Sequence, residues 1–365
     1  MKIIVCVDRL TGGGAQRVAA MWVTGWCARG HEVSIVVSNS RTPITYTIPE
    51  GVKIHSIDVP ISNGYIRHFA KLLTSKRKLE KIFNKETPDL VVSIAPTWGP
   101  LIYKAKGNMS FVVIGTDHNS FERPASAPMP NKTHWLKFEF SKKFDHYTVL
   151  TEADKKVIGD KLNNVSVLPN PLAFTPVVDV PSKKRIVLAM GRLDAGHSKG
   201  FDILIKAFGM SNHSGWTLQI AGGGSKESLD IYTKLAEECG VRESVEFLGF
   251  LDNPIQAYRD AGIFCLSSRY EGFGLVVTEA MSQGCACVVC DYKGRQREII
   301  RNESEGLICE PDNPQSLAVC LERMMQDDKY RKAVQHNSPM RAADYSIDKI
   351  MDKWDVIFKK LGLMS

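Results

Sequence analysis

Apolar segments typical of buried strands alternate with helix-like segments along this chain, and the alternation occurs twice. In the first half, the strand-like KIIVCVD is followed by a glycine turn, a helix-like segment and the strand-like HEVSIVVSN. After residue 184, RIVLAMGRL begins a second series with the same order of elements. Strands that alternate with helices favour a parallel, doubly wound sheet with right-handed crossovers. We therefore expect an α/β protein with two Rossmann-like, doubly wound domains that face each other across a cleft.

The chain is long enough for two domains, because 365 residues exceed what one core usually holds. Segment 173–184, AFTPVVDVPSKK, contains two prolines and no clear helical periodicity, and we expect it to be the linker. The N-terminal domain would then span 1–172 and the C-terminal domain 185–344. The last segment, 345–365, predicts an amphipathic helix that could pack back on the first domain.

Composition indicates a globular protein, with 44% apolar and 24% charged residues. No apolar stretch reaches the length that spans a bilayer, and the first residues do not resemble a secretion signal. Nine cysteines in such a chain favour reduced thiols. CACVVC at 285–290 lacks the second ligand pair of a zinc site, so we interpret it as a buried strand. We expect a cytoplasmic protein, with peripheral contact at the inner face of the membrane left open.

Positive charge is concentrated in the first half of the chain. Residues 1–175 hold 23 Lys and Arg against 14 Asp and Glu, whereas the remaining residues hold 24 against 26. This asymmetry predicts that the first half faces an anionic partner, which could be a membrane surface, a phosphorylated lipid or a nucleic acid. No recognition helix or clustered aromatic-basic motif is evident, so we do not expect nucleic acid.

Three glycine turns lie where ligands bind in open α/β sheets, beyond the carboxyl ends of strands. They are GGG at 12–14, GGG at 222–224 and GFG at 272–274. The first turn lacks the GxGxxG spacing of a dinucleotide site. Arg192 follows a strand and Lys199 precedes a helix, so both could contact phosphate oxygens. Each cation alone is more often solvated surface, but together with the GFG turn they favour a phosphate-bearing ligand.

Two glutamates flank the third turn. If a helix begins near Phe273, its first amides and its dipole can hold a pyrophosphate. Glu271 lies in the turn and Glu279 lies further along the helix, and carboxylates are good acceptors for hydroxyl groups. A nucleoside diphosphate sugar presents a ribose diol, a pyrophosphate and a hexose in this order. It is therefore the ligand that we expect.

Several of these segments resemble a known family. EGFGLVVTE resembles the E-x7-E signature of the retaining GT-B glycosyltransferases of family 4, and GRL…KGFDILIKAF resembles their Arg/Lys phosphate motif. SVLPNPL, VEFLGFLDNP and REIIRNESEGLICEPDNPQSLA are similar to further motifs of the family. The resemblance covers nearly all of 1–362. It implies the GT-B fold and the transfer of a hexose or N-acetylhexosamine from a nucleotide sugar, with a UDP-sugar as the expected donor.

The resemblance also implies roles for individual residues. Arg192 and Lys199 should bind the diphosphate. Glu279 should bind the ribose hydroxyls and Glu271 the donor sugar. His118, which alone would more often be structural, matches the family's active-site histidine, and it completes an expected catalytic set with Glu271, Arg192 and Lys199. The other expected donor contacts are Gly13, Gly14, Leu251, Phe273, Gly274 and Leu275.

We expect no obligatory metal and no cofactor, because the chain contains no Asp-x-Asp. The charge of the leaving group would be neutralised by Arg192, Lys199 and a helix dipole. The family implies retention of anomeric configuration, by a front-face path in which the departing phosphate deprotonates the acceptor. Two alternatives remain open: a sugar-nucleotide epimerase of the same architecture, and a non-catalytic nucleotide-sugar-binding protein.

The acceptor should meet the basic first half. Residues 64–86 predict a helix with an apolar stripe and a basic face, which either covers the sheet or lies on an anionic membrane. Residues 132–144 mix Trp135, Phe138, Phe140 and Phe144 with lysines, which favours interfacial contact. We therefore expect a lipid-linked saccharide or glycan acceptor, within polysaccharide biosynthesis.

Overall fold

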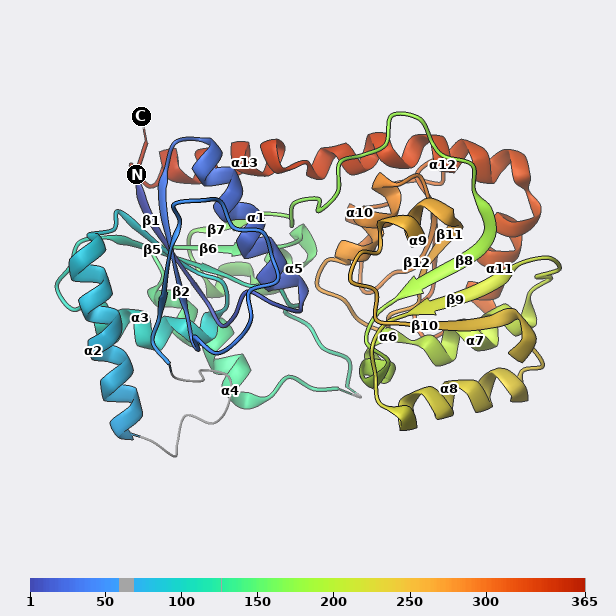
Figure 1. Cartoon of the computed structure of the whole chain (residues 1–365), viewed down its shortest axis with the longest axis horizontal. Coiled ribbons are helices and arrows are strands. Elements are labelled where there is room, and N and C mark those ends of the chain that lie inside the picture. Colours follow the sequence, from blue (N-terminus) through green and yellow to red (C-terminus); the bar gives the residue numbers. More distant parts are fainter. Residues whose placement is uncertain (59–68, 126, 365) are drawn as a thin grey trace. The chain divides into compact units, whose positions relative to one another are not determined.

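The computed structural model describes residues 1–58, 69–125 and 127–364, and the chain divides into two compact units (Figure 1). Unit 1 comprises Met1–Pro171 together with Ile347–Ser365, and unit 2 comprises Leu172–Ser346. Each unit is built on one parallel sheet. The two Rossmann-like domains expected from the alternating segments are confirmed.

Within the described residues, unit 1 contains a seven-stranded sheet in the order β3-β2-β1-β4-β5-β6-β7. The central strands β1, β2 and β4 are almost continuously apolar, because helices cover both faces of a parallel sheet. The strands span Lys2–Val7 (β1), Glu32–Val37 (β2), Lys53–Ser56 (β3), Leu90–Ser93 (β4), Val112–Thr116 (β5), His146–Val149 (β6) and Val165–Val167 (β7).

The last helix of the chain belongs to unit 1, where it packs on the first helix (Figure 1). The Trp354 ring lies 5.1 Å from the ring centres of both Trp22 and Trp26, and all three side chains are buried. These edge-to-face aromatic contacts bury a large apolar area, which holds the last helix on the first. The helices of unit 1 span Gly14–Ala28 (α1), Phe69–Glu86 (α2), Gly99–Lys106 (α3), Asn131–His134 (α4), Glu152–Ile158 (α5) and Ile347–Lys360 (α13).

Unit 2 contains a six-stranded sheet in the order β10-β9-β8-β11-β12-β13. Its strands span Lys184–Met190 (β8), Thr217–Ala221 (β9), Val245–Gly249 (β10), Ala261–Leu266 (β11), Ala286–Cys290 (β12) and Leu307–Cys309 (β13). Its helices span Gly196–Lys199 (α6), Phe201–Met210 (α7), Lys226–Glu238 (α8), Ile255–Asp260 (α9), Leu275–Ser282 (α10), Pro314–Gln326 (α11) and Asp328–Ala342 (α12).

The strand order of unit 2 changes direction at β8, which has β9 on one side and β11 on the other. The chain therefore leaves β8 and β11 toward opposite sides of the sheet, and the loops that follow these two strands lie at the point where the order reverses. In open α/β sheets this switch point is where ligands bind. It lies between the loops 191–200 and 267–274.

The segment expected to be a linker, 173–184, lies within unit 2 and is bonded to it. The Val177 amide donates to the Ser282 carbonyl at 2.8 Å. The Lys183 ammonium donates to the carbonyls of Tyr258 and Gln283, at 2.9 and 2.7 Å. These bonds fix most of the segment to α9 and α10.

The aromatic side chains of 132–144 are mostly internal. Phe138, Phe140 and Phe144 are buried in the core of unit 1, so the expectation that they form an interfacial surface is wrong. Trp135 differs, because about half of its surface is exposed (49%). The three phenylalanines pack because helix α4 and the turns after it cover one face of the sheet.

Helix α2 covers the sheet with Leu79 and Phe83, which are both fully buried. Leu73, at 45% exposure, does not join that core. Residues 64–68 of the helix expected at 64–86 lie outside the described residues. No described helix combines the length and the apolar character that crossing a bilayer requires.

CACVVC consists of Cys285 and the whole of β12, and its three cysteines are buried, which confirms the interpretation as a strand. Burial raises the pKa of the Cys285 thiol to about 11, so this side chain stays protonated and packs as an apolar group. Across the described ranges, no cluster of three or more His, Cys, Asp and Glu side chains could hold a metal ion.

Candidate active site

The loops after β8 and β9 touch through their backbones at the carboxyl edge of the unit 2 sheet. A Cβ atom on Gly222 would lie 1.7 Å from the Gly191 carbonyl oxygen, so only glycine fits there. The Leu193 amide donates to the Gly223 carbonyl at 2.9 Å. The loop after β8, which carries Arg192, and the glycine turn at 222–224 are therefore joined into one structure.

Lys199 and Glu271 form an ion pair that joins the loop after β8 to the loop after β11. The Lys199 side chain runs across Gly191. A Cβ atom added to Gly191 would lie 3.1 to 3.3 Å from the aliphatic carbons of Lys199. The Ser268 hydroxyl donates to Glu271 Oε1 at 3.1 Å, on the same oxygen that Lys199 contacts. Both charged side chains keep some exposure, 26% for Lys199 and 17% for Glu271. The switch point therefore presents a cation and a carboxylate that a ligand can reach.

Helix α10 begins at Leu275, directly after the turn that carries Glu271. Gly274 caps it in the left-handed conformation (φ 91°), where glycine is favoured, and it provides no side chain to occupy the first amides. The positive end of this helix therefore points into the loop region that holds the ion pair. Phe273 is buried and packs edge-on against Tyr345, with ring centres 5.3 Å apart, which anchors the turn.

Glu279 lies one turn into α10 and is almost fully buried. The buried Tyr258 hydroxyl, from α9, donates to Glu279 Oε2 at 2.9 Å. A buried carboxylate needs hydrogen-bond donors, and Tyr258 is one that the spacing of the sequence motifs does not reveal.

Arg192 is exposed at the end of β8, and the described residues provide no hydrogen bond or ion pair to its guanidinium group. Its neighbour Asp194 is held differently. Asp194 Oδ1 accepts from the Ser225 amide at 2.8 Å and from the Ser228 hydroxyl at 2.9 Å, which, with the charge of Arg192, lowers the pKa of that carboxyl. Leu251, expected near the base of the nucleotide, is partly buried in the loop after β10.

In unit 1, the glycine turn at 12–14 leads into α1. Gly13 caps the helix with φ 110° and Gly14 is its first residue. The Tyr46 hydroxyl donates to the Gly13 carbonyl at 3.1 Å and holds the turn from outside. A turn of this kind leaves the first amides of a helix available to an anion.

His118 follows β5 in the same unit. Its Nδ1 lies 3.1 Å from Asn170 Oδ1 and its Nε2 lies 3.3 Å from Thr116 Oγ1, while the Trp22 ring stands 5.4 Å from the imidazole. Burial lowers the pKa of His118, against the opposing effects of Asn170 and Asp117. The imidazole is therefore neutral at pH 7, and the Asn170 oxygen favours the tautomer with its proton on Nδ1.

The residue before His118 takes part in a buried ion pair. Lys137 Nζ lies 2.9 Å from Asp117 Oδ2, and both side chains are almost inaccessible (3% and 1% exposed). The same ammonium donates to the carbonyls of Asn119 and Ser120 at 3.0 Å, and it stands 4.2 Å from the Phe121 ring. Lys137 therefore holds the whole loop that carries His118.

The structure brings the predicted residues together within each unit. In unit 2, Arg192, Lys199, Glu271, Gly274 and Glu279 all lie on the loops and helix at the switch point. In unit 1, the Gly13–Gly14 turn and His118 lie at the carboxyl ends of β1 and β5. Sequence reasoning missed their supporting side chains, which are Asp117, Lys137, Asn170, Asp194, Tyr258, Ser268 and Arg269. Of these, Asn170 belongs to the motif SVLPNPL and Lys137 to the segment 132–144.

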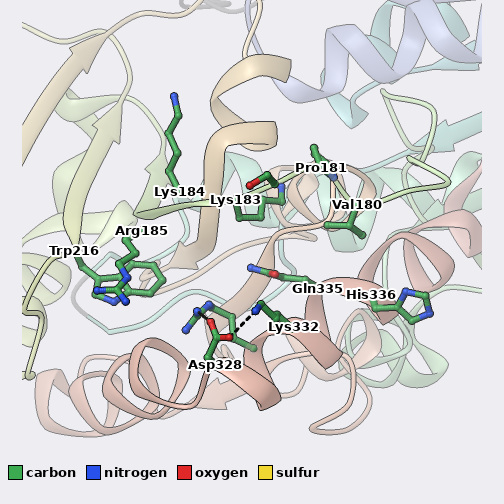
Figure 2. Close-up of a pocket in the computed structure, with 12 residues that line it drawn as sticks. Val180, Pro181, Lys183, Lys184, Arg185, Trp216, Asp328, Lys332, Gln335 and His336 are labelled. Carbon is green, nitrogen blue, oxygen red and sulfur yellow. Dashed lines mark hydrogen bonds and ion pairs between the residues drawn. The ribbon is translucent and has the colours of Figure 1, made fainter.

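A separate cavity of about 470 Å³ lies near the start of β8, at the opposite edge of the unit 2 sheet (Figure 2). Its lining is rich in basic side chains, and four of them, Lys183, Lys184, Arg331 and Lys332, already have partners. Lys183 donates to two carbonyls, and Lys184 pairs with Asp260 at 2.8 Å. Asp328 pairs with Arg331 and, at 2.7 Å, with Lys332, and Figure 2 labels Asp328 and Lys332. This cavity therefore does not resemble the phosphate site expected from Arg192 and Lys199.

Two family models match the chain, one for each unit. Residues 12–173 match the model described as Glycosyltransferase Family 4, and residues 174–341 match that described as Glycosyl transferases group 1. The protein is a glycosyltransferase, and the chain belongs to the GT-B glycosyltransferases of the family 4 type.

Relatives and solved structures agree with this assignment. The chain is 28% identical to the N-acetylgalactosamine-N,N'-diacetylbacillosaminyl-diphospho-undecaprenol 4-alpha-N-acetylgalactosaminyltransferase of Campylobacter jejuni, over 99% of this chain and 100% of the relative. Its fold is similar to that of a sucrose-phosphate synthase from Thermosynechococcus elongatus (TM-score 0.83, 18% identity, all of both chains). It is also similar to the fold of Anabaena HepE in complex with UDP-glucose (TM-score 0.76, 15% identity, all of both chains).

We predict that Lys137→Met lowers the free energy of unfolding by about 3–5 kcal/mol, because the change leaves Asp117 charged and buried without its partner. The matched control is Lys142→Met. Lys142 pairs with Glu139 in the same segment, but both side chains are about half exposed, so the loss should stay below about 1 kcal/mol. Urea denaturation of both variants measures the difference. Equal, small losses would contradict a structural role for the buried pair.

Proposed function

We propose that this glycosyltransferase is retaining and metal-independent, and that it moves a hexose or N-acetylhexosamine from a UDP-sugar to a lipid-linked saccharide or glycan. The observation that carries the proposal is the ion pair of Lys199 and Glu271 at the switch point of unit 2, beside the start of α10. A cation and a helix start suit the diphosphate, and a carboxylate beside them suits the hydroxyls of the sugar.

Binding of the donor exchanges the partners of this pair. The diphosphate offers Lys199 a stronger anion than one carboxylate, because several oxygens share its charge. Lys199 then turns to the phosphate, and Glu271 accepts hydrogen bonds from the sugar hydroxyls. The pair is partly exposed, so the exchange does not strand a buried charge.

The transition state places additional negative charge on the departing UDP as the bond between the anomeric carbon and the phosphate oxygen breaks. Lys199, Arg192 and the first amides of α10 are the groups that we assign to this charge. The proton of the acceptor hydroxyl passes to the departing phosphate oxygen while the new glycosidic bond forms on the same face. A metal ion is not needed in this scheme, because fixed cations and amides supply the stabilisation.

The nucleoside end of the donor is assigned to Glu279 and to the backbone near Leu251. The Tyr258 hydroxyl fixes one oxygen of the Glu279 carboxylate, which leaves the group oriented before the ribose diol binds. His118, neutral and held by Asn170, is assigned a hydrogen bond to the reacting sugar, and the Gly13–Gly14 turn an approach to the donor.

The acceptor assignment rests on the Campylobacter jejuni relative, whose name specifies a diphospho-undecaprenol-linked saccharide. UDP is assigned because HepE was solved with UDP-glucose and the relative transfers N-acetylgalactosamine. Peripheral contact with an anionic membrane fits a lipid-linked acceptor, the positive balance of residues 1–175, and the exposed Trp135 and Leu73 of unit 1.

We predict that Lys199→Ala lowers kcat by about 10²–10³, because the departing diphosphate loses one fixed donor. Glu271→Gln should also lower turnover strongly, since an amide is a weaker acceptor for sugar hydroxyls. The control is Lys206→Ala, an exposed lysine on the neighbouring α7. Initial rates at saturating donor, with circular dichroism to verify folding, make the comparison. Near-normal turnover in Lys199→Ala would refute the role of this residue.

We predict that UDP and one or more UDP-sugars raise the melting temperature of the protein, because ligand binding to the native state stabilises it. A panel of UDP-, GDP- and ADP-sugars measured by thermal shift identifies the donor. Glu279→Gln should reduce the shift for every ligand that contains ribose. NMR of the product formed from the best donor should show the anomeric configuration of the donor, and an inverted product would contradict a retaining mechanism. Activity should persist in EDTA, and complete loss of activity in EDTA would contradict metal independence.

We predict that the protein cosediments with vesicles that contain phosphatidylglycerol more than with neutral phosphatidylcholine vesicles, and that added salt weakens the difference. Trp135→Ala should reduce the bound fraction, because it removes an exposed aromatic ring next to lysines. Met210→Ala, at an exposed apolar residue of unit 2, is the control. Equal sedimentation with both vesicle types would count against membrane contact.

A further inference from the structure

Arg269 joins the two loops that carry Lys199 and Glu271. Its guanidinium donates twice to Asp202, with NH1 to Oδ1 at 2.8 Å and NH2 to Oδ2 at 2.7 Å. NH1 also donates to the His197 carbonyl at 3.0 Å, and Nε donates to Asp312 Oδ1 at 2.8 Å. Such a two-pronged bond to a carboxylate fixes the direction of both side chains as well as their distance.

The backbones of the two loops are bonded at the same place. The Arg269 amide donates to the Ser198 carbonyl at 2.9 Å, and the Ser267 hydroxyl donates to the Lys199 carbonyl at 2.9 Å. Gly200 makes the approach possible. Its φ of 64° favours glycine, and a Cβ there would lie 2.1 Å from the Ser267 carbonyl oxygen.

The charge of Arg269 is used inside the protein. The side chain is 14% exposed, and its hydrogen bonds to Asp202 raise its pKa above the ordinary range. Burial acts to raise the pKa of Asp202, but the hydrogen bonds and charge of Arg269 outweigh it and hold that pKa below its ordinary value. Arg269 thus differs from the exposed Arg192, which has a guanidinium free to meet a ligand.

Asp202 lies in the first turn of α7, two residues after the Gly200 cap. Lys199 comes immediately before that cap and ends α6. Arg269 comes two residues before Glu271 and one after Ser268, which bonds to Glu271. Its contacts therefore span from the carbonyl of His197 to the start of α7, and they enclose Lys199 on both sides along the chain.

We propose that Arg269 is a positioning residue, which sets Lys199 against Glu271 so that the ammonium meets the diphosphate of the donor. This inference rests on the proposed function, since it assigns a purpose to the geometry of two residues placed in the donor site. Catalytic and binding groups that are displaced by about 1 Å lose on the order of 10²-fold in rate. A lysine stem is long and flexible, so the backbone on both sides of Lys199 has to be held for its ammonium to keep one place.

The test is a double-mutant comparison with Lys199, read out by UDP binding in a calorimeter. Lys199→Ala should weaken UDP binding by about 10- to 100-fold, because it removes a charge-assisted hydrogen bond. Arg269→Met as a single change should weaken UDP binding by about 10-fold. When Lys199 is already alanine, the same change should weaken UDP binding by less than about 2-fold, because Arg269 acts through Lys199. Arg269→Lys, which keeps the charge but not the fork, should recover only part of the affinity.

Arg323→Met is the matched control, since Arg323 pairs with Glu303 on the surface of the same unit and should leave UDP binding unchanged. Thermal unfolding of each variant verifies that the affinities compare folded proteins. If Arg269→Met binds UDP like the wild type, or loses the same factor with and without Lys199, the positioning role is overturned. If Lys199→Ala itself binds UDP normally, the proposed function fails instead, and the two outcomes are distinct.

Discussion

The close approach of loops at the carboxyl edge of the unit 2 sheet is the constraint on which the rest of the site depends. Gly222 and Gly200 have no room for a side chain against the carbonyls of Gly191 and Ser267. Because these backbones touch, the loops after β8, β9 and β11 form one surface instead of three independent loops. Lys199 on one loop and Glu271 on another are thereby held close enough to form their ion pair. Fixing a glycine in one conformation costs conformational entropy. Here each glycine loop is held because it is attached to strands of the sheet.

Two ion pairs in this protein show how exposure determines what a pair can do. Lys137 and Asp117 are almost inaccessible, and the ammonium is also occupied by two carbonyls, so the pair is a fixed support. Lys199 and Glu271 are partly exposed, so solvent or a ligand can reach both charges. Removing water from a charge is expensive unless its partner stays. The first pair therefore suits a loop that must not move, and the second suits a site that must accept an anion.

The sequence predicted the strands that are nearly continuous apolar runs, such as β1, β2, β8 and β12. Strands that are buried on both faces of a sheet have apolar residues at successive positions, without the alternation of polar and apolar residues seen in half-exposed strands. It did not predict β3, β6 or β7, whose residues (KIHS, HYTV and VSV) are short and mixed in polarity. β3 and β7 are the edge strands of the unit 1 sheet, where fewer apolar neighbours are needed, whereas β6 lies next to the edge and is buried although two of its four residues are His146 and Thr148. The aromatic residues of 132–144 were misplaced for a related reason. Lysines between aromatic residues occur on membrane surfaces and on helices whose aromatic face is internal, and only tertiary packing separates the two.

The candidate site residues that the sequence located are those held in local motifs, where spacing alone determines the geometry. Glu271, Gly274 and Glu279 belong to one turn and one helix, so their relative positions follow from a few backbone torsions. Their supports come from far along the chain: Tyr258 bonds to Glu279 across 21 positions, and Arg269 to Asp202 across 67. No periodicity links such partners, because the parallel crossovers that bring them together are set by the order of strands in the sheet.

The same fold occurs twice in this chain, yet the two units provide different chemistry at equivalent edges. Unit 1 offers a glycine turn and a neutral histidine supported by Asn170, whereas unit 2 offers two cations, two carboxylates and a helix start. A shared sheet determines where loops converge, and side chains on those loops determine what they bind. A neutral imidazole is a weak partner for a strong anion, whereas the two cations and the helix start of unit 2 suit one. The division of charge therefore makes the carboxyl edge of unit 2 the one that suits a phosphate-bearing ligand, which is where the proposed function puts the diphosphate.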